Sequence, residues 1–146
     1  MRAVVSRVRR ASVSVDADGA GPTLLGSFEE PGLLVLLGVT HEDGPAQAAT
    51  MARKLHELRI LRDERSAAET GAPLLVVSQF TLYGDARKGR RPTWIAAARP
   101  EHAEPLVDAV VAALRERGAR VEVGRFGAPM AVESVNDGPF TIIVEV

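Results

Sequence analysis

The chain has 146 residues, 46% of them apolar, and a formal net charge of −1. This size and composition predict one domain with a core that needs no cross-links, and the absence of cysteine excludes disulfides and thiolate metal sites. With no bilayer-length apolar run and no leader-like N-terminus, we expect a cytoplasmic protein without a membrane partner. Because the net charge is small, any contact with nucleic acid depends on a local patch.

The first third of the chain is predicted to form strands. Apolar residues alternate with others over residues 3–8 and again over 11–15, a pattern typical of half-buried strands. Residues 16–22 have the composition of a turn, and residues 23–28 are expected to form a further short strand. The nearly continuous apolar run at 33–39 predicts a central strand.

Two helices are predicted, at 45–57 and at 101–117. The second carries one apolar stripe made of Ala103, Leu106, Val107, Val110, Val111 and Leu114. Gly118 is expected to end this helix, and Pro105 is expected in its first turn. Between the helices we expect a short strand at 58–61, a loop at 62–72 and a buried strand at 74–77, and residues 119–146 predict two or three further strands.

The order of these elements predicts a single layered α/β domain over residues 1–146. Two helices cannot cover both faces of so much sheet, so we expect sheet packed on sheet with the two main helices on one side. A chain of this length would leave sheet surface uncovered. A homodimer is therefore the expected assembly.

Polar residues interrupt the apolar pattern directly after the strand at 74–77. Ser78 and Thr81 could act as nucleophiles, bind a substrate or cap local backbone. No histidine lies in a pattern that would pair with them, and no G-x-S-x-G motif is present, so a Ser-His-Asp hydrolase is not predicted. The sequence also lacks metal-ligand spacing and a phosphate-binding glycine loop, so we expect no metal and no cofactor.

A basic cluster follows soon afterwards, with four positive charges in five residues at Arg87, Lys88, Arg90 and Arg91. Such a run is often only a solvated face, but four phosphate contacts would give strongly salt-dependent binding. Tyr83 and Trp94 flank the cluster and could stack on bases. Near the C-terminus, Gly138-Pro139 precedes an apolar strand, and on residue pattern alone this step is simply a turn.

Taken together, these segments resemble the D-aminoacyl-tRNA deacylase family. The resemblance covers most of the chain and includes two signature motifs, Ser78-Gln79-Phe80-Thr81-Leu82 and Asn136-Asp137-Gly138-Pro139-Phe140-Thr141. It implies a homodimeric enzyme that hydrolyses the ester between a D-amino acid and the 3′ adenosine of tRNA, as chiral proofreading in translation. Glycyl-tRNA, including glycine mischarged on tRNA-Ala, is implied as a further substrate.

The resemblance also implies roles for individual residues. In the family the Gly-Pro peptide is cis and reaches into the active site of the partner subunit, which corresponds to Gly138 and Pro139 supported by Arg7. Further implied residues are Ser78, Gln79, Phe80 and Thr81 for catalysis, Asn136, Thr141 and Met130 for substrate binding, and Arg87, Lys88, Arg90 and Arg91 for tRNA. Three features depart from the family pattern: residues 63–70 replace a longer Gly-Lys-Met-Asn-like stretch, Pro129 replaces an acidic or amide residue, and Ser6 replaces a Gln beside Arg7.

The implied substrate makes the lack of a base easier to understand. An aminoacyl ester is already activated and carries a neighbouring 2′-hydroxyl, so backbone N–H groups around Phe80 and Thr81 could suffice to stabilise the oxyanion. Covalent attack by Thr81 is the alternative. A rigid Gly-Pro wall would reject L side chains and admit D residues and glycine. Two other classes stay open, a non-catalytic RNA-binding dimer and an esterase for small activated esters, and no DNA partner is expected.

Overall fold

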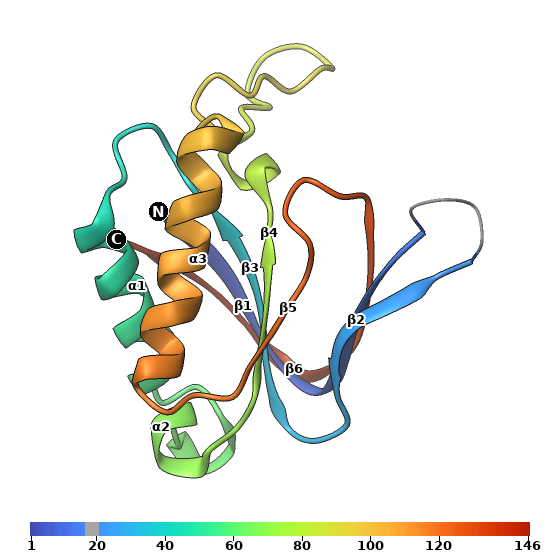
Figure 1. Ribbon diagram of the computed structural model, residues 1–146, viewed down its shortest axis with the longest axis vertical. Helices are drawn as coiled ribbons and strands as arrows, with labels where there is room; N and C mark the ends of the chain where they lie inside the picture. The colour runs from blue at the N-terminus through green and yellow to red at the C-terminus, as the bar shows by residue number, and fades with distance from the viewer. Residues whose placement is uncertain (17–20) are drawn as a thin grey trace.

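The computed structural model describes residues 1–16 and 21–146. Within them the chain forms a single mixed α/β domain, as predicted (Figure 1). The elements are β1 (Arg2–Val15), β2 (Thr23–Phe28), β3 (Gly32–Gly38), α1 (Pro45–Glu57), η1 (Arg62–Glu64), α2 (Ala67–Thr70), β4 (Leu74–Ser78), η2 (Phe80–Tyr83), α3 (Pro100–Glu116), β5 (Val121–Val123) and β6 (Met130–Glu145). Residues 17–20 of the predicted turn lie outside the described residues. None of the described helices has both the length and the apolar character needed to span a bilayer.

The strands form one continuous, curved sheet in the order β2-β1-β3-β4-β5, with β6 on the other edge of β1. The first half of β1 pairs with β3 and its second half pairs with β2. On its other side β1 pairs with β6 along nearly its whole length, and all three pairings are antiparallel. β3, β4 and β5 are parallel. The sheet curves so that its two halves face each other across a second core. The predicted packing of sheet on sheet therefore occurs between two halves of one sheet.

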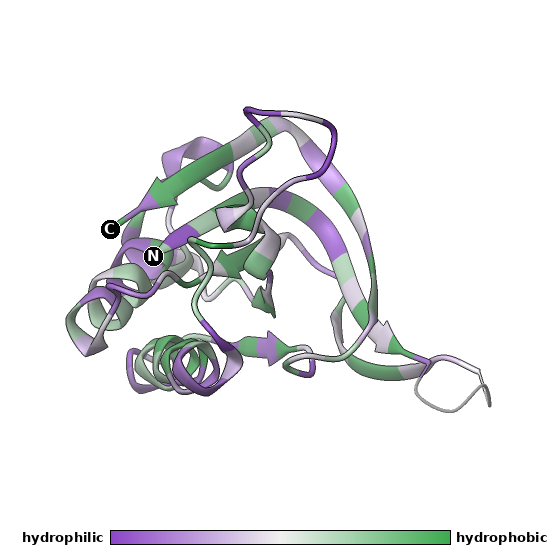
Figure 2. Cartoon of the chain, turned by 90° about the horizontal axis from the view of Figure 1, so that it is seen from above, coloured by the Kyte–Doolittle hydropathy of each residue, from purple (hydrophilic) through white to green (hydrophobic). Residues whose placement is uncertain are grey.

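The centre of the sheet is buried on both faces. Alternate residues of β3 and β4, such as Leu33 and Leu74, face the helices, whereas Leu34 and Leu75 face a second core between the two halves of the sheet. This double burial explains why both strands are continuous apolar runs in the sequence. Alternating hydrophobic and hydrophilic bands along the longer strands are visible in Figure 2.

The helices α1 and α3 pack side by side on one face of the sheet (Figure 1). The predicted apolar stripe of α3 is buried, and Leu114 is fully buried. Gly118 has φ of +84° and ends the helix as expected, with the Ala119 N–H bonded to Leu114 O at 3.0 Å. Pro105 lies in the second turn and not in the first, so that prediction was wrong. The helix begins at Pro100, where a proline is well accommodated.

Two predictions for the segment between α1 and β4 were wrong. Residues 58–61 form no strand; Ile60 and Leu61 are apolar because the segment is buried against the helical core. Residues 62–72 are not only a loop, because they contain η1 and α2. Ser66 caps α2 by accepting the Glu69 N–H at 3.2 Å while the Glu69 carboxylate accepts the Ser66 N–H at 2.7 Å. This reciprocal cap is the Ser-x-x-Glu signal of a helix start.

A bulge interrupts the pairing of β1 with β6. Ser6 pairs with Thr141 and Val8 pairs with Asn136, so the four residues 137–140 of β6 lie opposite the single residue Arg7. Extra residues on one strand leave the ladder and bend it. The Gly138-Pro139 step therefore projects from within a long strand, and it does not start the last strand as its residue pattern suggested.

Candidate active site

The candidate active site begins where the buried strand β4 ends. Leu74 and Val76 face the helices, and Ser78 lies on the same side because side chains alternate along a strand. β5 pairs with β4 only as far as Val76, so the end of β4 lies on an open edge. Ligands of α/β sheets bind at the carboxyl ends of the strands, and Ser78 occupies such an end.

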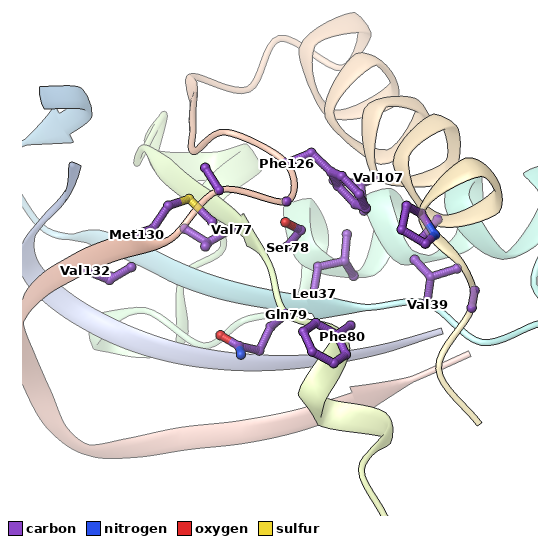
Figure 3. A pocket seen from close by; sticks show the side chains of 15 residues that line it. Leu37, Val39, Val77, Ser78, Gln79, Phe80, Val107, Phe126, Met130 and Val132 are labelled. Carbon is purple, nitrogen blue, oxygen red and sulfur yellow. The ribbon is translucent and has the colours of Figure 1, made fainter. Parts of the chain in front are cut away.

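A pocket of about 470 Å³ opens beside Ser78. Its walls come from the ends of β3 and β4, the first half of α3 and residues 126–132. Figure 3 shows the Ser78 hydroxyl among the apolar side chains of Leu37, Val107 and Phe126, with Met130 on the far wall. The pocket is therefore apolar, with a polar edge where β4 ends.

Among the described residues that line this pocket, none has a side chain that titrates near neutral pH. A serine or threonine nucleophile needs a base within hydrogen-bond reach. The imidazole Nε2 atoms of His41 and His102 are instead 2.9 Å from the carbonyl oxygens of Ile95 and Asp43. The pocket thus suits stabilisation of charge by fixed dipoles better than it suits base-assisted attack by a side chain.

Backbone N–H groups are available at the polar edge. In η2 the N–H groups of Leu82 and Gly84 donate to Gln79 O and Thr81 O at 3.2 and 2.9 Å. No hydrogen bond to another described residue uses the N–H of Phe80 or Thr81, as expected for the first residues of a helical turn. The Thr81 hydroxyl accepts a hydrogen bond from Gln79 Nε2 at 2.5 Å.

Contacts on both sides hold η2 in place. Arg2 Nη1 donates to Leu82 O at 2.7 Å, and the Arg2 guanidinium lies 5.0 Å from the centre of the Tyr83 ring. The ring of Phe80 meets that of Trp94 edge-on at 5.5 Å between centroids. The N–H groups that follow β4 therefore lie on an anchored turn, although Phe80 is 57% exposed.

The basic cluster lies in the loop between η2 and α3, which projects beyond the N-terminal end of α3 (Figure 1). Asp85 and Thr93 exchange backbone hydrogen bonds of 2.8 and 3.0 Å that close the loop. Arg87 folds back on Asp85 with two side-chain hydrogen bonds of 2.7 and 2.9 Å. Lys88, Arg90 and Arg91 form no ion pair with a described residue, so three of the four charges are available to an anion.

The second motif forms the bulge in β6. The Gly138–Pro139 peptide bond is cis, as the resemblance implies. Arg7 Nε donates to Asp137 O at 2.9 Å, and its guanidinium lies 4.8 Å from the centre of the Phe140 ring. A Cβ on Gly138 would collide with Asn136 Oδ1. The bulge is therefore held at both ends by Arg7, and Pro139 is exposed between them.

Asp137 is the charged centre of this bulge. Arg62 donates to both of its carboxylate oxygens, at 2.6 and 3.0 Å. Hydrogen bonds from Arg62 hold the pKa of Asp137 below its ordinary value, against the opposing effect of burial, and the charges of Arg7 and Arg9 act in the same direction. Asp137 is thus ionised at neutral pH.

The two motifs do not share a pocket within one chain. The predicted residues that line the pocket are Ser78, Gln79, Phe80 and Met130, whereas Thr81, Arg7, Asn136, Gly138, Pro139, Thr141 and the basic cluster are absent from its lining. Arg7 and Asp137 border a separate groove of about 610 Å³. Thr141 Oγ1 lies 2.9 Å from Ser6 Oγ, and Asn136 Nδ2 donates to Arg7 O at 2.9 Å.

Sequence reasoning missed two parts of this region. The apolar wall formed by Val107 and Phe126 belongs to elements that were expected only to pack. Arg62 was expected in a loop, although it binds Asp137. The Ser-x-x-Glu pattern at 66–69 is the signal that could have shown an ordered segment there. No group of His, Cys, Asp or Glu among the described residues is arranged to hold a metal ion.

Comparison with known proteins identifies the family. The family described as D-Tyr-tRNA(Tyr) deacylase matches residues 4–145. The chain is 65% identical over 146 residues to a D-aminoacyl-tRNA deacylase of Thermobifida fusca (strain YX), covering 100% of both chains. The chain belongs to the D-aminoacyl-tRNA deacylase family. It is therefore an enzyme that hydrolyses ester bonds, with aminoacyl-tRNA as its substrate.

A second curated relative carries the same family name, and two solved structures share the fold. A D-aminoacyl-tRNA deacylase of Kineococcus radiotolerans is 63% identical over 145 residues and covers 99% of both chains. Among solved structures, one titled c-Myc DNA Unwinding Element Binding Protein aligns with a TM-score of 0.88 and 37% identity over 100% of this chain and 99% of that chain. A probable eukaryotic D-amino acid tRNA deacylase aligns with a TM-score of 0.80 over 99% and 98% of the two chains, and at 16% identity it shows the fold alone.

The basic loop of this deacylase gives a pH-dependent prediction. Hydrogen bonds from Arg87 lower the pKa of the Asp85 carboxyl from 3.8 to about 2. Any stability that this pair gives the loop is present above pH 3.8 and is lost as the pH falls through the pKa of the folded state. Carboxyl ¹³C NMR measures the pH midpoint of the Asp85 titration. In Arg87→Gln it should return toward 3.8, whereas Lys88→Gln should leave it near 2; an unchanged midpoint in Arg87→Gln contradicts the pairing.

Proposed function

We propose that this deacylase acts in chiral proofreading of translation, removing D-amino acids and glycine from tRNA while sparing L-aminoacyl-tRNA. The observation that carries the proposal is the pocket at the end of β4. Among the described residues, this pocket has an apolar wall, no titratable side chain in its lining, and backbone N–H groups at its edge that form no hydrogen bond. Such a site fits an ester that is already activated. A cytoplasmic location stays a prediction.

Hydrolysis is proposed to depend on the backbone and on the substrate. The N–H groups of Phe80 and Thr81 would stabilise the oxyanion that forms when water attacks the ester carbonyl, and one such donor contributes roughly 3–4 kcal/mol. The ribose 2′-hydroxyl of the terminal adenosine would assist the attack, and it would also distinguish an RNA end from a DNA end. The apolar surface around Val107 and Phe126 would exclude bulk water from the reacting ester.

Selection against L-amino acids is proposed to come from a second copy of the chain. Pro139 is exposed on the bulge and Gly138 is half-buried, and neither borders the pocket of its own chain, which supports their insertion into the partner's pocket in a homodimer. There they would form a wall that leaves no room for an L side chain. Rejection of this kind requires no recognition of a D side chain and admits glycine, which lacks the rejected group.

The tRNA is proposed to contact the basic loop. Lys88, Arg90 and Arg91 lie in the loop that follows η2, and Phe80 of η2 lines the pocket. Trp94 is 43% exposed and could stack on a base, whereas the ring of Tyr83 is already covered by Arg2. Arg87 would act mainly by ordering the loop through Asp85.

A direct test compares four substrates: D-Tyr-tRNA, L-Tyr-tRNA, Gly-tRNA and D-tyrosine ethyl ester. We expect the first and third to be hydrolysed and the other two to remain, because the wall rejects the L side chain and the ethyl ester lacks the RNA. Release of the labelled amino acid measures each rate. Each substrate is also incubated without enzyme, since aminoacyl esters hydrolyse spontaneously.

Each other outcome identifies a different function. Hydrolysis of the ethyl ester at a similar rate would indicate an esterase for small activated esters. Binding of tRNA without hydrolysis of any substrate would indicate a non-catalytic RNA-binding dimer. Unlabelled single-stranded DNA is included as a competitor because one related structure is named for binding DNA; we expect it to leave hydrolysis unchanged.

Removing the Thr81 hydroxyl separates the two mechanisms. Thr81→Ala is expected to keep D-Tyr-tRNA hydrolysis within roughly tenfold of the wild-type rate, because the backbone N–H that stabilises the oxyanion is retained. A covalent mechanism would instead lose several orders of magnitude. Single-turnover kinetics measures the chemical step, and Thr93→Ala in the adjacent loop is the matched control.

Neutralising two charges tests the proposed tRNA interaction. Arg90→Gln combined with Arg91→Gln is expected to weaken tRNA binding and to reduce the slope of log K against log salt by about one for each phosphate that the variant no longer neutralises. Filter binding at several salt concentrations measures both. The control pair Arg53→Gln and Arg117→Gln changes the net charge equally on the helices, and Arg117 follows the end of α3 that points away from the basic loop (Figure 1). Equal slopes for the two pairs would exclude the interaction.

A further inference from the structure

The Asp137 carboxylate is buried, with 9% of its side chain exposed, and it faces three arginines. Arg62 is the closest, at 2.6 Å, followed by Arg7 at 3.3 Å and Arg9 at 3.8 Å. Only Arg62 engages both carboxylate oxygens by hydrogen bonds. A bidentate pair of this type fixes orientation as well as distance, so Arg62 determines how the carboxylate is turned.

Arg62 directly precedes residues 63–70, the segment in which this chain departs from the family pattern. The two residues after it, Asp63 and Glu64, have positive φ angles of 58° and 54°. Such angles are uncommon for residues other than glycine and cluster where a structure must hold a particular geometry. The turn is closed by hydrogen bonds between Leu61 and Arg65 and between Arg65 and Arg62, at 2.9 and 3.3 Å. A tightly folded turn therefore presents Arg62 to the bulge of β6.

We propose that Arg62 is a positioning residue for stereochemical selection, which acts by fixing Asp137 and, through it, Gly138 and Pro139. The inference rests on the proposed function of the Gly138-Pro139 wall. Arg7 holds the backbone carbonyl of Asp137 and covers Phe140, whereas Arg62 holds the side chain of Asp137. The two arginines constrain different atoms of the residue that precedes Gly138, so neither replaces the other.

The position of this wall is sensitive to such a constraint. Gly138 and Pro139 lie in a bulge outside the ladder that joins β1 and β6, so strand pairing does not fix them. Without Arg62 the buried carboxylate would keep only the longer contacts to Arg7 and Arg9 and would turn toward them. A displacement of about 1 Å at a reacting centre can change a rate by roughly a hundredfold, and rejection of an L side chain depends on a clearance of that size.

The test compares Arg62→Gln with Arg65→Gln, a matched control from the same turn whose side chain contacts Glu69 and not Asp137. We expect Arg62→Gln to lower the ratio of D-Tyr-tRNA to L-Tyr-tRNA hydrolysis by roughly ten- to a hundredfold. Arg65→Gln should keep the wild-type ratio. Arg62→Lys, which retains the charge but cannot form the bidentate pair, should give an intermediate ratio.

Two further measurements separate positioning from general stability. Asp137→Asn should lower the ratio as Arg62→Gln does, and the double variant should be no worse than either, because both changes break the same ion pair. A purely structural role would lower both rates in proportion and leave the ratio unchanged, and that result overturns the proposal. Additive effects in the double variant would overturn it as well.

Hydrogen exchange keeps this inference distinct from the proposed function. Peptides covering residues 134–142 should exchange faster in Arg62→Gln than in the wild type or in Arg65→Gln. If exchange is unchanged, Arg62 does not hold the bulge and the inference fails, whatever the enzyme hydrolyses. If exchange rises but the wild type does not discriminate D from L, then Gly138-Pro139 does not select stereochemistry. The inference is then contradicted together with the proposed function, although Arg62 still orders the bulge.

Discussion

The burial of β3 and β4 on both faces is the constraint on which the rest of the structure depends. One face of this strand pair carries the helical core and the other carries the core between the two halves of the curved sheet. Polar groups can therefore be placed only where these strands end. Because the strands are parallel, their carboxyl ends meet on one side of the molecule, and the pocket beside Ser78 lies there.

The strand β1 supports both halves of the proposed site. Arg2 near its beginning holds η2 through the Leu82 carbonyl, and Arg7 further along holds the bulge of β6 through the Asp137 carbonyl. Both arginines bind backbone oxygens, so they fix the path of the chain as well as contacting carboxylate side chains. A site that depends on backbone N–H groups and on a backbone wall needs support of this kind.

Much of the fold could be predicted because its signals are local. The apolar stripe of α3, the stop at Gly118 and the runs that became β3 and β4 each depend on neighbouring residues alone. The segment at 58–61 was predicted wrongly because burial in the helical core makes an irregular stretch apolar, which resembles a strand in the sequence. Pro105 was misplaced because the helix begins earlier than its apolar stripe.

The geometry of the site could not be predicted from the sequence because it depends on contacts between residues that are distant in the chain. Ser78 and Gln79 stand out because they end an apolar run, but Arg62 and Asp137 meet across 75 positions. Asp137 lies in a recognisable motif, whereas nothing in the sequence around Arg62 indicates this contact. The bulge at 137–140 likewise becomes visible only when the pairing with β1 is known. Contacts between distant residues decide this geometry, and the pattern around each residue does not record them.

The bulge of β6 also affects how the molecule behaves among copies of itself. Among the described strands β6 pairs only with β1, so its other side is a sheet edge 16 residues long with Ile143 exposed. A long, regular edge is a template for strand addition and aggregation. The bend at 137–140, with a proline that has no N–H to offer, divides this edge into two short stretches that differ in direction. The bulge at 137–140, which we propose selects stereochemistry, thereby also disfavours open-ended association of copies through this edge.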